Sequence, residues 1–86
     1  MSVEYYRKRL IELRASVAAE REAKKRDNER YAGYIKSATR TSSKASYRKQ
    51  KIDHARSHDL HIESLKRQIE SAKESLARER ERAKRK

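Results

Sequence analysis

Apolar side chains in the first half of the chain recur at alternating steps of three and four residues, which places them on one side of an α-helix. Charged residues replace them at Glu20, Lys24 and Asp27, and the stripe resumes at Tyr31. The pattern therefore predicts one long helix over residues 3–38 with a polar interruption in its middle. The apolar positions before the interruption are Val3, Tyr6, Leu10, Leu13 and Val17.

The second half of the chain repeats this arrangement in reverse order. Ile52 is followed by a polar stretch over residues 54–61, and an apolar stripe then runs toward the C-terminus. This pattern predicts a second helix over residues 44–84. Its stripe consists of Ile62, Leu65, Ile69, Ala72 and Leu76.

Residues 39–43, Thr-Arg-Thr-Ser-Ser, are the place where the helical pattern lapses. If the chain turns there, the two stripes meet: Leu13 faces Ile69, and Tyr31 faces Ile52. The polar stretch over residues 20–28 then lies opposite the polar stretch over residues 54–61. Mirrored interruptions favour an antiparallel hairpin over the alternative, a single unbroken helix that pairs with other chains.

Such a hairpin has few residues with which to build a core. Leu, Ile, Val and Phe number 12 of the 86 residues, fewer than a self-sufficient globular domain usually contains. We therefore expect an all-α fold: a single antiparallel helical hairpin (a coiled coil) over residues 1–86 that associates into a dimer or a four-helix bundle. The residues expected to pack at its interfaces are Val3, Tyr6, Leu10, Leu13, Val17, Tyr31, Ile52, Ile62, Leu65, Ile69 and Leu76.

Positive charge is concentrated around the predicted bend. The chain has a net charge of +12, and between Glu29 and Asp53 it carries seven basic residues and no acidic one. Tyr31, Tyr34 and Tyr47 lie in the same stretch, and aromatic rings among cations can hold phosphates and stack on unpaired bases. The segment over residues 30–51 is therefore a candidate nucleic-acid-binding site. The alternative is that the tyrosines cover the end of the hairpin and the lysines keep it in contact with water. The cations proposed to bind nucleic acid or another anion are Arg40, Lys44, Arg48, Lys49 and Lys51.

Three histidines, His54, His58 and His61, follow one another along one face of the second helix. Histidines one turn apart can chelate zinc or nickel, and Glu20 or Asp27 on the facing helix could complete such a site. The alternative is a polar layer that fixes the register of the hairpin. Protonation of these histidines beside Arg and Lys also predicts a hairpin that loosens near pH 6.

The sequence offers no catalytic residues and argues against an enzyme. It has no cysteine, no glycine-rich phosphate loop and too little mass to shape a pocket, so we expect no cofactor and no small-molecule substrate. It has no signal-peptide pattern and no apolar run of membrane-spanning length. We therefore expect no membrane insertion, and a location in the cytoplasm or export by a route that is independent of a signal peptide.

Residues 38–50 and 62–69 together resemble the N-terminal helical regions of bacterial effector and defence proteins. In those proteins a coiled coil with a Ser/Thr-rich middle precedes a Toll/interleukin-receptor-like (TIR) domain. The resemblance implies a module for assembly or targeting, and it carries over no NAD-hydrolysing activity, which belongs to the TIR domain.

The length and the hairpin pattern are also similar to small accessory proteins of type VII secretion, which pair with the helical N-terminus of an exported toxin. The chain lacks the Trp-Xaa-Gly bend of the best-known group, since it contains no Trp. Together these features favour a protein–protein interaction module that self-associates or binds another helical protein. Nucleic-acid binding through the bend is the alternative function.

Overall fold

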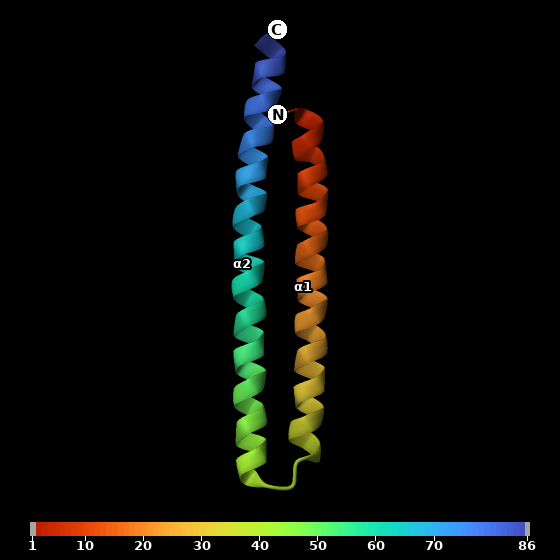
Figure 1. Ribbon diagram of the computed structural model, residues 1–86, viewed down its shortest axis with the longest axis vertical. Coiled ribbons are helices and arrows are strands. Elements are labelled where there is room, and N and C mark those ends of the chain that lie inside the picture. Colours follow the sequence, from red (N-terminus) through yellow and green to blue (C-terminus); the bar gives the residue numbers. More distant parts are fainter. Residues whose placement is uncertain (1, 86) are drawn as a thin grey trace.

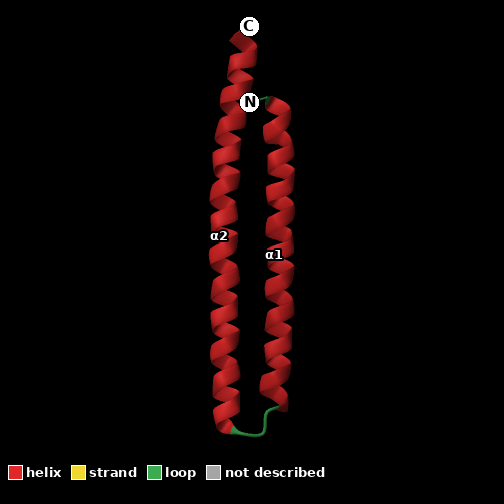
Figure 2. Ribbon diagram, in the orientation of Figure 1, coloured by secondary structure: helices red, strands yellow, loops and turns green. Residues whose placement is uncertain are grey.

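A computed structural model describes residues 2–85, and these residues form two long α-helices and no strand (Figures 1 and 2). Helix α1 spans Val3–Ser37 and helix α2 spans Thr41–Arg85. The all-helical class predicted from the sequence is confirmed. Neither helix is long and apolar enough in any stretch to cross a membrane, as judged over the described residues.

The ends of α1 are set by local hydrogen bonds. Ser2 has an extended backbone, and its Oγ accepts a hydrogen bond from the backbone N–H of Tyr5 at 3.2 Å, which satisfies one of the free donors of the first turn. At the other end the backbone of Ala38 is extended, and its N–H donates to the Tyr34 carbonyl oxygen at 3.0 Å. The helix therefore ends at Ser37, one residue before the predicted end at residue 38.

The bend is shorter than the sequence predicts, because α2 begins at Thr41 and not at residue 44. The backbone N–H of Lys44 donates to the carbonyl oxygen of Arg40 at 3.0 Å, so the first helical hydrogen bond already encloses Thr41, Ser42 and Ser43. Small hydroxyl residues are well suited to the start of a helix, where backbone N–H groups lack helical partners. The Ser/Thr-rich stretch is thus mostly the first turn of α2.

The two helices lie side by side and antiparallel, and the chain forms a thin rod (Figure 1). The Cα atoms extend over 70 × 14 × 12 Å, and their radius of gyration is 19.6 Å, against about 12 Å for a compact domain of this length. Helix α2 is the longer helix, and its C-terminal turns project beyond the start of α1. The bend occupies one end of the rod and both termini lie toward the other.

A single apolar stripe holds the helices together, and it is concentrated in the half of the rod away from the bend. Val3, Tyr6 and Ile69 are partly buried against it, and Tyr31 is a buried residue on the other side of the polar interruption. The side chains of Arg9 and Gln68 meet across the same half at 3.2 Å. The stripe itself consists of Leu10, Leu13, Val17, Ile62, Leu65, Ala72 and Leu76.

Ile52 is the packing residue that the sequence placed wrongly. It was expected to face Tyr31, but it is 57% exposed, and the ring that lies 5.0 Å from that of Tyr31 belongs to His54. Residues two apart in a helix point to nearly opposite sides, so the placement of His54 toward α1 turns Ile52 toward solvent.

Candidate functional site

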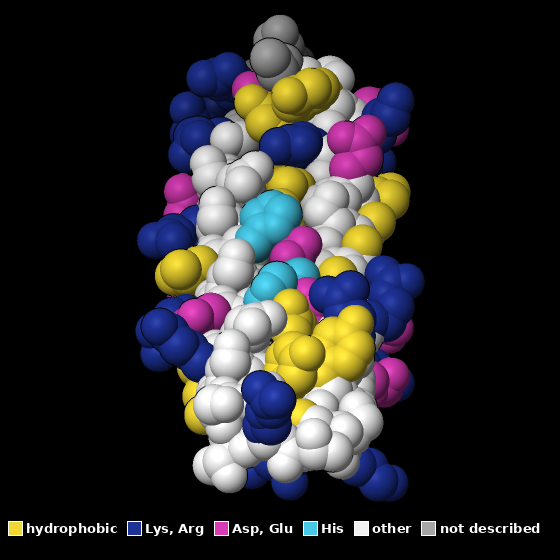
Figure 3. All heavy atoms as spheres, turned by 60° about the horizontal axis from the view of Figure 1, so that its bottom comes forward, with side chains coloured by type: hydrophobic (Ala, Val, Ile, Leu, Met, Phe, Trp, Pro, Cys, Tyr) yellow, Lys and Arg dark blue, Asp and Glu magenta, His cyan; other side chains and the backbone are white. Residues whose placement is uncertain are grey.

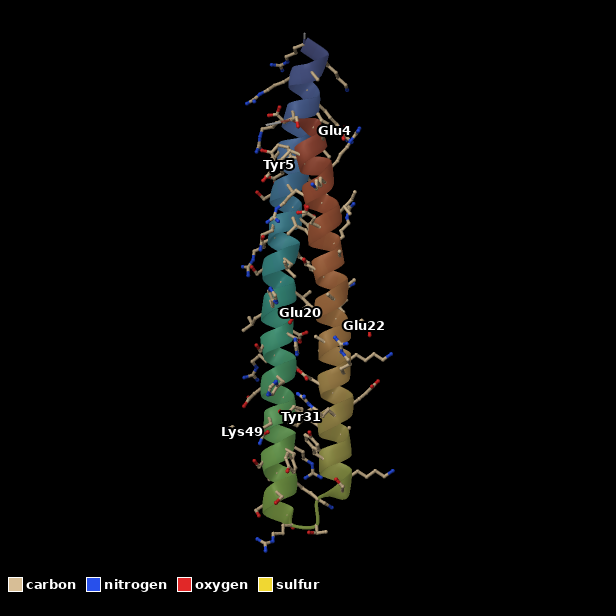
Figure 4. The ribbon with its side chains drawn as sticks, turned by 45° about the vertical axis from the view of Figure 1, so that its right-hand side comes forward. Glu4, Tyr5, Glu20, Glu22, Tyr31 and Lys49 are labelled. Carbon is tan, nitrogen blue, oxygen red and sulfur yellow. The ribbon has the colours of Figure 1, made fainter. Side chains whose placement is uncertain are left out.

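The most connected group of polar side chains lies halfway along the rod, where both apolar stripes are interrupted. We call Glu20, Asp27, His54, His58 and His61 the histidine layer. Figure 4 shows Glu20 of α1 between the two helices, whereas Glu22 projects away from α2. Figure 3 shows the histidines beside carboxylates in the middle of one face, with hydrophobic side chains between them and the bend. The polar stretches therefore face each other, as the sequence predicts.

His58 bridges two carboxylates of α1. Its Nδ1 lies 2.5 Å from Glu20 Oε1, and its Nε2 lies 2.6 Å from Asp27 Oδ2. An ionised carboxylate accepts hydrogen bonds and cannot donate them, so with both carboxylates ionised this arrangement is fully satisfied by a His58 ring that carries a proton on each nitrogen, the imidazolium form. The three side chains are 16%, 19% and 20% exposed, and this shelter from water strengthens the charge-assisted hydrogen bonds.

The other two histidines extend this bridge on either side. His61 Nδ1 lies 2.9 Å from Glu20 Oε2, and His54 Nδ1 lies 3.6 Å from Asp27 Oδ2. The remaining nitrogen of His54, Nε2, lies 3.1 Å from the Tyr31 hydroxyl. The network therefore connects the histidine layer to the buried tyrosine nearest the bend.

The bridge changes the proton affinities of its members. The hydrogen bond to Asp27, followed by the hydrogen bond to Glu20, raises the pKa of His58 above its ordinary value of 6.5. The hydrogen bond from His58 is likewise the main cause that lowers the pKa of Glu20 and the pKa of Asp27. All three shifts favour the charged bridge.

The direction of these shifts reverses the expected effect of pH. The sequence predicted that protonated histidines loosen the hairpin near pH 6 because they add charge beside Arg and Lys. In the structure the His58 ring lies between Glu20 and Asp27 with one nitrogen facing each carboxylate, so a positive charge on the ring favours the contact between the helices. The expectation of an acid-loosened hairpin is therefore wrong for His58.

The structure does not bring the three histidines together as ligands of one metal ion. A metal-binding imidazole coordinates through a free nitrogen lone pair, and both His58 nitrogens face carboxylates at hydrogen-bonding distance. His54 and His61 bond to different carboxylates on the two sides of His58. Across residues 2–85, no three His, Asp or Glu side chains come together in an arrangement that could hold a metal ion.

The bend end of the rod has a different character, because it carries cations without acidic partners. Of the seven basic residues between Glu29 and Asp53, Arg30 pairs with Asp27 at 2.8 Å. The other six form no ion pair with any described residue. They comprise Lys36 and the five predicted anion-binding residues, Arg40, Lys44, Arg48, Lys49 and Lys51. Figure 4 shows Lys49 projecting from α2 near the bend.

Three tyrosines lie among these cations, on the side of the rod where the helices meet. Tyr34 packs against Tyr47 with the ring centroids 5.3 Å apart, and edge-on against Tyr31 at 5.6 Å. The three rings thus join both helices next to the bend. The sequence pointed to these tyrosines individually, but the Tyr34–Tyr47 contact depends on the register of the hairpin.

The carboxylate partners of His58 are the part of the site that sequence reasoning missed, since Glu20 and Asp27 were considered only as additional metal ligands. Their spacing of seven residues, two helical turns, was the feature of the sequence that could have identified them.

Comparison of the chain with protein-family models, curated proteins and solved structures found no match.

Proposed function

We propose that the chain is a non-enzymatic protein–protein interaction module whose hairpins associate through their outer faces, most simply as a dimer that forms a four-helix bundle. The thin core supports this proposal. Among residues 2–85, eight apolar residues are buried, and no side chain is less than 2% exposed. Two helices that bury only one stripe leave most of their surface in water, and pairing with further helices is the usual way to stabilise such a unit.

The observation that carries the proposal is the set of large apolar residues left outside the stripe. Ile11 is 68% exposed, Ile52 is 57% exposed and Leu60 is 65% exposed. Ile52 and Leu60 are separated by about two helical turns, which brings them to the same side of α2. We infer that this side of α2 packs against a helix of a second copy or of another helical protein.

The charged faces of the hairpin would then select the partner and its orientation. Lys24–Asp59 and Arg82–Glu79 pair within the hairpin at 2.7 Å and 2.9 Å, and such pairs add little to stability. The charges that remain unpaired on the outer faces would act on a partner mainly through specificity. The resemblance to helical regions of secreted and defence effectors supports a role as a targeting or accessory partner of a larger effector.

Light scattering tests the association directly. We expect the wild-type chain to have at least twice the monomer mass of 10.2 kDa at both low and high salt. The double variant Ile52→Ser/Leu60→Ser should return to the monomer mass and keep a helical circular-dichroism spectrum. Ala77→Ser, which changes another exposed position of α2, is the matched control and should leave the mass unchanged. A wild-type chain that stays at 10.2 kDa at every concentration contradicts self-association.

A further inference from the structure

The bend end of the rod combines three features that lie in one place only after the chain has folded: a hollow, an aromatic pair and a group of unpaired cations. The hollow has a volume of about 410 Å³ and is open to solvent. It is lined by side chains from both helices and from the bend, among them Tyr34, Tyr47, Arg40, Ser37, Thr39 and Ser43. Its lining therefore offers aromatic rings, one guanidinium group and several hydroxyl groups to a ligand.

The aromatic part of this lining packs against a buried ring and remains accessible. Tyr34 packs edge-on against Tyr31, which is 8% exposed, while Tyr34 itself is 43% exposed. Tyr47 approaches Tyr34 from α2 with an angle of 42° between the ring planes. Because each ring already contacts a neighbouring ring, it has lost part of its freedom before a flat ligand stacks on it, which lowers the entropic cost of binding.

The charge around the hollow is of one sign. Arg40 lines the hollow, Lys36 is in the last turn of α1 and Lys44 is in the first turn of α2. No acidic residue lies in the first turn of α2 or anywhere between Glu29 and Asp53. This segment carries more than half of the net charge of +12. All of its cations except Arg30 are free of ion pairs with the described residues, so a polyanion would gain several contacts there without displacing an internal ion pair.

We propose that the bend end is a binding site for single-stranded nucleic acid, with Tyr34 and Tyr47 stacking on an unpaired base and Arg40, Lys36 and Lys44 contacting the phosphates. Single strands fit better than a duplex because the rings lie in a hollow, where only an unstacked base can reach them. Single strands also fit better than an acidic protein segment, because such a segment uses the charge but leaves the rings without a partner. This function goes beyond association through the outer faces and is independent of it.

Fluorescence anisotropy with a labelled single-stranded oligonucleotide of about 10 nucleotides tests the proposal, with the same sequence as a duplex and polyglutamate as competitors. We expect the single strand to bind most tightly, with an affinity that falls as salt is raised. Arg40→Gln/Lys44→Gln should make the negative slope of log affinity against log salt shallower by about 1.4, since each single-strand phosphate contact contributes about −0.7. Tyr34→Leu, which keeps an apolar side chain but removes the ring, should weaken binding about tenfold.

The control for charge is Lys8→Gln/Lys25→Gln, which removes the same charge from exposed positions outside the bend and should leave most of the affinity intact. An equal loss in the two double variants would overturn the bend as the site. Equal binding of single strand and duplex, with no effect of Tyr34→Leu, would overturn stacking. Polyglutamate that competes as well as the oligonucleotide would assign the cations to an acidic protein. Circular dichroism of each variant, and its mass without nucleic acid, separates these outcomes from a failure to fold or to associate.

Discussion

Among single residues, His58 makes the strongest polar connection between the helices, and its effect on stability depends on pH in a defined direction. The folded chain holds the His58 proton more tightly than the unfolded chain, since the pKa is raised. Its stabilisation is therefore complete below the ordinary pKa of 6.5 and is lost as the pH rises through the raised value. Glu20 and Asp27, whose pKa values are lowered, stabilise the fold above their ordinary values of 4.5 and 3.8 and lose this effect at lower pH.

We therefore predict that the bridge contributes most between about pH 4.5 and pH 6.5. The change to test is His58→Gln, which keeps a polar side chain but cannot carry the positive charge. The melting temperature of the wild type should exceed that of the variant most clearly in this range, and the difference should shrink toward pH 9 and toward very low pH. Thermal unfolding followed by circular dichroism measures this difference.

His61→Gln is the matched control for this experiment. His61 also contacts Glu20, but its side chain is 58% exposed, so its loss should change the melting temperature less. A difference between wild type and His58→Gln that grows steadily from pH 5 to about pH 9 would contradict the charged bridge. It would support the acid-loosened hairpin that the sequence alone suggests.

At the scale of the helices, the contribution of each residue depends on which side of the rod it occupies. Leu13 is 3% exposed in the stripe, whereas Ile11, two positions earlier, is 68% exposed. We predict that Leu13→Ala lowers the free energy of unfolding by about 2–5 kcal/mol, the usual cost of truncating a buried leucine. Ile11→Ala should change it by less than about 1 kcal/mol, because little of that side chain is removed from water. Urea unfolding of both variants tests the assignment of the stripe.

If self-association covers Ile11, Ile11→Ala also lowers the free energy of unfolding. Urea unfolding must therefore be measured at several protein concentrations. A loss in Ile11→Ala that appears only at high concentration belongs to the interface between hairpins. A loss of equal size in Leu13→Ala and Ile11→Ala at low concentration would show that the stripe is assigned to the wrong side of α1.

The helices were predictable from sequence where an apolar stripe fixes their rotation. Spacing alone identified the buried positions Leu10, Leu13 and Leu65, because apolar residues at helical spacing have one side on which to be buried. Ile52 was misplaced because Tyr47 defines the rotation of this part of α2: Tyr47 packs against Tyr34, and His54, seven residues later, takes the same side. The start of α2 was missed because Ser and Thr are compatible with both a bend and a first helical turn.

The histidine layer was predictable as a pair of facing polar stretches but not as a set of partners. Which carboxylate meets which ring nitrogen depends on the rotation and register of both helices to within one residue. A histidine face with acidic residues opposite is equally compatible with a metal site and with ion pairs at the level of sequence. Only the placement of Glu20 and Asp27 on both sides of His58 distinguishes the two.

At the scale of the whole molecule, the rod separates its features along its length. The apolar stripe occupies the half that contains both termini, the histidine layer lies in the middle and the unpaired cations surround the bend. The proposed association surface, around Ile52 and Leu60, lies next to the histidine layer and adjoins Lys51, whereas the hollow is lined by Tyr34, Tyr47 and Arg40 at the bend. The double variants Ile52→Ser/Leu60→Ser and Arg40→Gln/Lys44→Gln therefore test association and nucleic-acid binding separately when both the mass and the affinity of each are measured.

The length of the rod gives a final prediction, since it differs between the two topologies that the sequence pattern allows. A hairpin has a long axis of 70 Å, whereas an unbroken helix of the whole chain would be about 130 Å long at a rise of 1.5 Å per residue. Pairing of hairpins side by side into a four-helix bundle widens the particle but leaves its length nearly unchanged. We therefore expect small-angle X-ray scattering to give a maximum dimension much closer to the hairpin length at every concentration, even where light scattering reports a doubled mass. A doubled mass with a maximum dimension near the longer value would instead show that the bend opens and that the helices pair between chains.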